Sequence, residues 1–121
     1  MAINRILVVD DSPTEQHYFR ELLAKQGYQV LTAETGERAI ELARSELPDL
    51  ILMDVIMPGM NGFQATRTIK RDESIRHIPV IMCTTKDQET DKIWGIRQGA
   101  RDYLIKPVSE AALLGKIRAL G

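Results

Sequence analysis

Short runs of apolar residues recur at wide spacing along the chain. Four of them cover residues 6–9, 50–53, 80–83 and 103–105, and a weaker fifth run covers 30–33. Each run is almost continuously apolar rather than alternating, which is typical of strands that are covered on both faces. We therefore expect five buried strands.

Segments with the periodicity of a helix separate these runs. Apolar residues recur in them at spacings of three and four positions: Phe19, Leu22 and Leu23; Ala39, Ile40, Ala43 and Leu47; Ala65 and Ile69; Ile93, Ile96 and Ala100; and Leu113, Leu114, Ile117 and Leu120. Capping residues precede three of the segments (Ser12, Thr35 and Ser109), and Gly27 follows the first. Five strand–helix units predict a doubly wound α/β fold, (βα)5, with a parallel sheet and helices on both faces.

Size and composition narrow the class of protein. We expect one domain over residues 1–121. The net charge is −1, whereas domains built to grip nucleic acid usually carry a large basic excess. No apolar run is long enough for a membrane span or a signal peptide. A single cysteine, Cys83, fits a reducing compartment, and with His17 and His77 it does not make a zinc-ligand spacing. We expect a cytoplasmic protein.

Residues whose side chains can bind a ligand or react follow the predicted strands. In an open α/β sheet, ligands bind beyond the carboxyl ends of the strands. The residues there are Asp10 and Asp11, Asp54, Thr84, and Lys106. Taken singly, each has an ordinary explanation: the first two acids as helix caps, the threonine as a strand residue and the lysine as a solvated one. Their joint placement on one edge points instead to a functional site.

Three carboxylates at one edge require a cation. Two like charges about 4 Å apart cost on the order of 4 kcal/mol at an effective dielectric constant near 20. An acidic cluster of oxygen ligands favours Mg²⁺, which also takes phosphate oxygens. If Asp54 accepts a phosphoryl group, then Mg²⁺, the Lys106 ammonium and the Thr84 hydroxyl can each take one of its oxygens.

Longer motifs around these residues resemble the receiver domain of two-component response regulators. The matching stretches are VDDS at 9–12, LMDVIMPGMNG at 52–62, PVIMCTT at 79–85 and GARDYLIKP at 99–107. The resemblance covers essentially the whole chain and implies a flavodoxin-like sheet in the strand order 2-1-3-4-5. It also implies a cis peptide bond between Lys106 and Pro107.

The resemblance implies a role for each site residue. Asp54 is the phosphoacceptor, and it holds Mg²⁺ together with Asp10, Asp11 and the main-chain carbonyl of Ile56. Thr84 and Lys106 contact the phosphoryl group and respond to its presence.

Further positions belong to the switch and its tuning in this family. The resemblance implies that Tyr103 changes rotamer as Thr84 moves and turns from solvent to an inward position, altering the surface formed by helix 4, strand 5 and helix 5. Ile56 and Lys86 occupy positions that tune hydrolysis of the phosphoryl group, and Thr85 stands where alanine or glycine is usual. His17 and His77 receive no role and are expected at the surface.

The expected partners also follow from resemblance. We expect no effector region after the fifth helix and therefore expect the output to be contact with another protein, as in stand-alone chemotaxis-type receivers. Trp94 and Ile96 lie in the helix-4 segment of the output surface. Residues 84–95 are similar to regulators of type IV pilus twitching motility, which implies a CheA-like histidine kinase as phosphodonor.

The same residues also bear on three alternative functions. A haloacid-dehalogenase-like phosphatase needs a second acid two residues after the nucleophile, where this chain has Ile56. A flavodoxin-type cofactor binder needs a first loop rich in hydroxyls or glycine, whereas Asp10 and Asp11 repel phosphate unless a cation intervenes. A receiver-like docking module that is not phosphorylated remains the best alternative.

Overall fold

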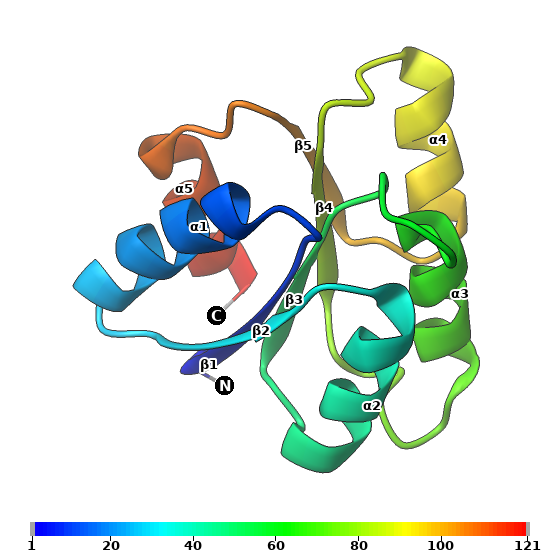
Figure 1. Cartoon of the computed structure of the whole chain (residues 1–121), viewed down its shortest axis with the longest axis horizontal. Helices are drawn as coiled ribbons and strands as arrows, with labels where there is room; N and C mark the ends of the chain where they lie inside the picture. The colour runs from blue at the N-terminus through cyan, green and yellow to red at the C-terminus, as the bar shows by residue number, and fades with distance from the viewer. Residues whose placement is uncertain (1, 121) are drawn as a thin grey trace.

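The computed structural model describes residues 2–120 and shows five strands alternating with five helices (Figure 1). The strands are β1 (Arg5–Val9), β2 (Gln29–Ala33), β3 (Leu50–Met53), β4 (Val80–Thr84) and β5 (Asp102–Ile105). The helices are α1 (Pro13–Lys25), α2 (Gly36–Glu46), α3 (Gly62–Arg71), α4 (Glu89–Arg97) and α5 (Glu110–Leu120). Each strand lies within one residue of its predicted bounds.

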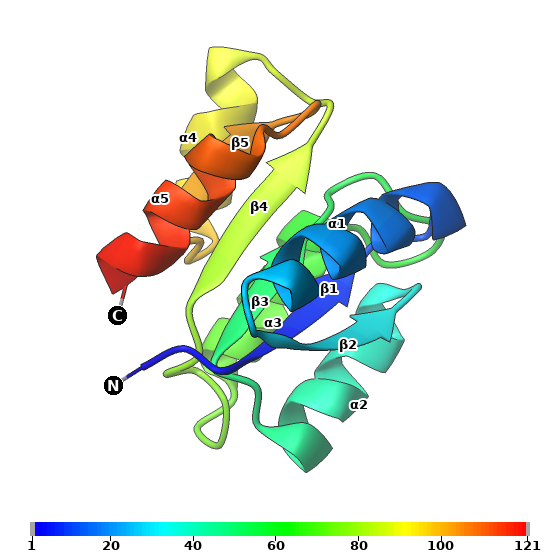
Figure 2. The same cartoon turned by 90° about the vertical axis from the view of Figure 1, so that its left-hand side faces the viewer.

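All strand pairs are parallel, and the sheet has the order β2-β1-β3-β4-β5. This confirms the doubly wound fold and the strand order that the resemblance implied. Helices α1 and α5 cover one face, and α2, α3 and α4 cover the other (Figures 1 and 2). The order changes direction at β1, which is where such folds bind ligands.

Alternate residues of the central strands supply the two cores. Ile6 and Val8 of β1 pack with the apolar faces of α1 and α5. Leu7 and Val9 pack with α2 and α3 on the other face. Because both faces of β1, β3 and β4 are buried, their sequences are apolar throughout.

Two predictions about helix faces were wrong. The stripe of Ile93, Ile96 and Ala100 predicted the inward side of α4, but Ile93 and Ile96 are exposed and the buried residue of this helix is Gly95. The exposure of Ile96 agrees with its other expected place, in the output surface. We expected Leu47 on the buried stripe of the second helix, but it caps α2 in the left-handed conformation (φ 47°) and is exposed. In both cases the docking of the backbone, rather than the apolar pattern, decided which side faces inward.

No helix in residues 2–120 combines the length and the apolar character that a membrane span requires.

Candidate functional site

Main-chain hydrogen bonds beyond the strands bring the predicted site residues to one edge. The N–H of Asp10 donates to the carbonyl of Ala33, and the N–H of Asp54 donates to that of Val9. At the same edge, beyond β4 and β5, the N–H of Lys106 donates to the carbonyl of Thr84. The parallel ladder thus continues past the strands and fixes where each functional side chain begins.

The ammonium of Lys106 lies among three carboxylates. Its Nζ is 2.7 Å from Asp10 Oδ2, 3.1 Å from Asp54 Oδ2 and 3.2 Å from Glu15 Oε1. Asp10 is 2% exposed and Asp54 is 7% exposed, whereas Asp11 lies at the surface. The buried negative charges are therefore compensated by a buried cation, as ionised groups out of water require.

Burial and pairing shift the pKa values of the ionisable groups in opposite directions. Burial raises the pKa of the Asp10 carboxyl, although hydrogen bonds from Lys106 and from the N–H of Ser12 pull it down. Burial alone would lower the pKa of Lys106, but its hydrogen bond to Asp10 and the charge of Asp54 outweigh burial and raise it. Lys106 is therefore a fixed positive charge at neutral pH.

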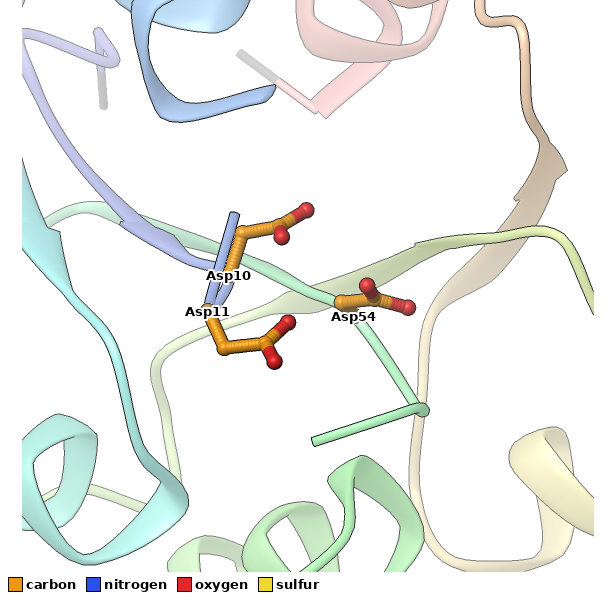
Figure 3. A group of neighbouring side chains, drawn as sticks. All are labelled: Asp10, Asp11 and Asp54. Atoms are coloured by element: carbon orange, nitrogen blue, oxygen red, sulfur yellow. The ribbon is translucent and has the colours of Figure 1, made fainter. Parts of the chain in front are cut away.

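The three aspartates have the geometry of a site for a divalent cation. One carboxylate oxygen from each of Asp10, Asp11 and Asp54 lies within 4.8 Å of the other two. Figure 3 shows these carboxyl groups gathered at the ends of β1 and β3. An all-oxygen set of this size, open to solvent at Asp11, suits Mg²⁺, which keeps several of its waters. The donor set therefore fits the cation predicted from the sequence.

Asp54 and Thr84 lie at the ends of neighbouring strands, β3 and β4. The N–H of Ile56 donates to Asp54 Oδ1 at 3.2 Å, so the loop after β3 also orients this carboxylate. Thr84 is fully buried, and its hydroxyl oxygen accepts from the N–H of Lys86 at 3.3 Å. Within residues 2–120 no hydrogen bond joins Thr84 to Asp54.

Tyr103 occupies the inward position in this structure rather than the solvent-facing one from which we expected it to turn. It is 9% exposed, and its hydroxyl donates to the carbonyl of Lys86 at 2.8 Å. Gly95 of α4 packs on the ring, since a Cβ there would lie 3.0 Å from Tyr103 Cδ2. Tyr103 thereby connects the loop after Thr84 to α4.

Sequence reasoning missed Glu15 as a partner of Lys106. An acid in the first turn of a helix has an ordinary explanation in the helix dipole, so its position alone gives no signal. Only the packing of α1 beside the loop after β5 shows that Glu15 reaches the ammonium. Tyr18, on the same helix, donates to the carbonyl of Val108 and joins α1 to this loop.

The remaining sequence expectations concern the Lys106–Pro107 bond, the two histidines and the cysteine. The Lys106–Pro107 peptide bond is cis, as the resemblance implied. His17 and His77 are exposed, which confirms their surface placement. Cys83 is buried, and burial raises its pKa to about 12.

Comparisons with known proteins agree with this geometry. The family model of the response regulator receiver domain matches residues 6–118. The chain is 60% identical to protein PilH of Pseudomonas aeruginosa over 116 residues, which cover 96% of both chains. It is 43% identical to the response regulator PleD of Caulobacter vibrioides, of which the match covers 26%.

Solved structures give the same assignment. The chemotaxis protein CheY4 of Vibrio cholerae superposes with a TM-score of 0.92 at 31% identity, covering 99% of this chain and 100% of that one. The family model, the relative PilH and the structural neighbour CheY4 each match nearly the whole chain. The matched region includes all five strands of the sheet, in the order β2-β1-β3-β4-β5. The chain belongs to the family of response regulator receiver domains.

Proposed function

We propose that this protein takes a phosphoryl group onto Asp54 and thereby switches a protein-binding surface. The observation that supports this most is the arrangement around Lys106, whose ammonium lies between the carboxylates of Asp10 and Asp54. A buried cation beside an oriented carboxylate, with an exposed acid at the opening, provides both a nucleophile and a charge partner for a phosphoryl group. We also propose that residues 1–121 form a single receiver domain, since the family match spans 6–118.

The proposed step is the displacement of a donor by a carboxylate oxygen of Asp54. The bond from phosphorus to the donor nitrogen of a phosphohistidine breaks as a new P–O bond forms to Asp54, and the histidine leaves with the electron pair. The Lys106 ammonium, now 3.1 Å from Asp54 Oδ2, is close enough to pass to a phosphoryl oxygen. Charge-assisted hydrogen bonds of this kind are about twice as strong as neutral ones.

Asp10, Asp11 and Asp54, with the main-chain carbonyl of Ile56, would hold Mg²⁺ in this proposal. The ion supplies neutralisation of the charge that gathers on the carboxylate and phosphoryl oxygens. The protein's own residues do the remainder: Asp10 keeps Lys106 in place, and Ile56 orients Asp54 through its N–H. We propose that the chain promotes its own phosphorylation and dephosphorylation in this way, rather than acting on a separate substrate.

The proposed switch runs through Thr84 and Tyr103. Thr84 is the hydroxyl on the neighbouring strand that can move to a third phosphoryl oxygen. Its Oγ1 now accepts from the N–H of Lys86, and the carbonyl of Lys86 accepts from Tyr103. A movement of Thr84 toward Asp54 therefore pulls on the segment that anchors Tyr103, and α4 rests on that ring through Gly95. The surface of α4, β5 and α5 is the proposed output.

A histidine kinase is the phosphodonor that membership of this family implies, and we propose one of the CheA-like kind. The 60% identity to PilH supports the expectation, drawn from residues 84–95, of a role in type IV pilus and chemotaxis-like motility control. The cytoplasmic location expected from the lone Cys83 stays a prediction.

Intact mass spectrometry tests the acceptor. After treatment with acetyl phosphate and Mg²⁺, the native protein should gain the mass of one phosphoryl group, and Asp54→Asn should gain none. Chelation of Mg²⁺ should abolish the gain in the native protein. A native protein that stays unmodified at saturating donor and Mg²⁺ would favour the docking module without phosphorylation.

The emission of Trp94, the only tryptophan, tests the switch. Beryllofluoride, a phosphoryl mimic, should shift this emission in the native protein, shift it less in Thr84→Ala and leave it unchanged in Asp54→Asn. If the mimic binds but amide chemical shifts of α4, β5 and α5 do not move, the proposed output surface is wrong.

A further inference from the structure

A basic groove lies between α3 and α4, away from the three aspartates. Its cavity volume is about 400 Å³, and its lining contains Arg67, Lys70 and Arg71 of α3, followed by Arg97 and residues 98–99 at the end of α4. The two helices are neighbours on one face of the sheet (Figure 1). We call this feature the α3/α4 groove.

A fifth cation, Arg101, is not part of this lining and belongs to another cavity. It lies near enough to Lys70 to repel it: burial, and then the charge of Arg101, hold the pKa of Lys70 below its ordinary value. Within residues 2–120 no ion pair joins any of these five cations to a carboxylate. Other cations of the chain do have partners, such as Arg44 with Asp72.

Favourable interaction with helix dipoles explains the positions of only some of these cations. Lys70, Arg71 and Arg97 stand in the last turns of their helices, where cations are favourable. Arg67 lies a turn earlier in α3, and Arg101 lies beyond the end of α4, so the dipoles explain neither. The four cations that line the groove repel one another, and an anion bound there relieves this repulsion.

Local packing holds the groove in shape. The Nζ of Lys70 donates to the carbonyls of Arg76 and Ile78, at 3.1 and 2.6 Å. Gly99 has φ +110°, and a Cβ on it would lie 2.5 Å from Lys70 Cγ. The lysine stem therefore packs directly against the turn that follows α4. This contact fixes Lys70 of α3 against the turn after α4 at one part of the groove lining.

An exposed aromatic residue of α4 lies one turn before Arg97. Trp94 precedes Arg97 by three positions and residue 98 by four, so it lies on the same helical stripe, one turn closer to the active edge. It is 47% exposed. Tryptophan and arginine are the residue types most enriched at the energetic centres of protein interfaces. Ile96 lies on a different side of α4, two positions or about 200° away from Trp94.

The charge of the remaining surface distinguishes between possible anions. Of the 16 Lys and Arg residues, four line the groove, and the other twelve are outnumbered by 17 Asp and Glu residues. The rest of the chain therefore carries a net charge of −5. A membrane or a long nucleic acid would meet that surface as well and be repelled, whereas a short acidic segment contacts the groove alone.

We propose that the α3/α4 groove binds an acidic segment of a partner protein, with carboxylates on Arg67, Arg71 and Arg97 and an apolar side chain on Trp94. Arginine guanidinium groups suit this because they bind carboxylates in a bidentate manner. The site is separate from the acceptor Asp54, so it adds a docking surface to the proposed phosphoryl switch. The two surfaces share Trp94, whereas the cations of the groove belong to the docking surface alone.

Fluorescence anisotropy with a defined probe tests the proposal. The probe is a fluorescein-labelled peptide of repeated Glu-Glu-Leu units, and a Gln-Gln-Leu peptide of equal length is its neutral control. The double variant Arg67→Glu/Arg71→Glu should bind the acidic probe about tenfold more weakly or worse, which corresponds to about 1.4 kcal/mol. Trp94→Ala should weaken binding as well. The matched control is Arg20→Glu/Arg118→Glu, which changes the same charge at exposed positions of α1 and α5 and should bind like native protein.

Each other outcome overturns the proposal. Equal losses in both double variants would show that only net charge matters, and equal binding of the neutral peptide would show that the carboxylates are irrelevant. Tighter binding to phosphatidylglycerol vesicles or to a single-stranded oligonucleotide than to the acidic peptide would assign the groove to another class of ligand. Phosphorylation of Arg67→Glu/Arg71→Glu by acetyl phosphate should be unchanged, which separates a failure of this proposal from a failure of the proposed acceptor.

Discussion

Replacing Lys106 by methionine should expose how strongly the acidic edge depends on one ammonium group. The substitution keeps much of the side-chain volume but removes the charge that lies 2.7 Å from Asp10 and 3.1 Å from Asp54. Two buried carboxylates then face each other, with Asp11 nearby, and no protein cation between them. We expect a large loss in the free energy of unfolding.

The magnitude follows from burial. The side chains of Lys106, Asp10 and Asp54 are 9%, 3% and 8% exposed, so water screens their charges poorly. Removing one partner of a buried pair costs about 3–5 kcal/mol, because the remaining charge stays buried without compensation. Asp11 is exposed and leaves the edge open to water, so we expect the lower end, about 3 kcal/mol.

Urea unfolding with and without Mg²⁺ measures this loss. Lys116→Met is the matched control: Lys116 pairs with Asp102 at 2.9 Å but is 45% exposed, so its loss should cost less than about 1 kcal/mol. Mg²⁺ at a hundred times its dissociation constant should restore about 2.7 kcal/mol to Lys106→Met. A loss for Lys106→Met no larger than that for Lys116→Met would refute the reasoning, and the absence of any Mg²⁺ effect would contradict the cation site.

Three further predictions concern the packing around Tyr103 and Cys83. Gly95→Ala should lower the free energy of unfolding in the urea assay by about 1–3 kcal/mol, because its Cβ would lie 2.8 Å from Met82 Sδ. The control is Gly115→Ala, whose Cβ meets nothing within 4 Å and which should raise the free energy of unfolding by up to about 1 kcal/mol. Cys83 should resist a thiol reagent at pH 8 in the native protein and react after unfolding, since burial raises its pKa to about 12; rapid native labelling would contradict its burial. Burial, and then the charges of nearby acids, raise the pKa of Tyr103 to about 12, so its contribution to stability is fully present below pH 10 and is lost as the pH rises through 12; Tyr103→Phe should remove this step from the alkaline unfolding profile, and an unchanged profile would show that another group is responsible.

Much of the candidate site was predictable because parallel strands place their carboxyl ends on one edge. Once five apolar runs define β1 to β5, the residues that follow them must meet. Asp10, Asp54 and Lys106 accordingly do so, with their N–H groups continuing the ladder. The roles given to these residues came from motif resemblance and not from the pattern, since an aspartate after a strand is chemically ambiguous by itself.

The sequence by itself determined the strands, their class of sheet and the edge where charge collects, because apolar periodicity and chain order suffice for these. Only the tertiary structure decided that Lys106 lies between two aspartates 96 and 52 positions away, that Glu15 joins them and that Tyr103 faces inward. It also decided that α4 docks through Gly95 and that Arg97 at its end lines one groove with the cations of α3. These features depend on close approach between segments far apart in the chain, and apolar spacing within one segment carries no information about the partner it meets.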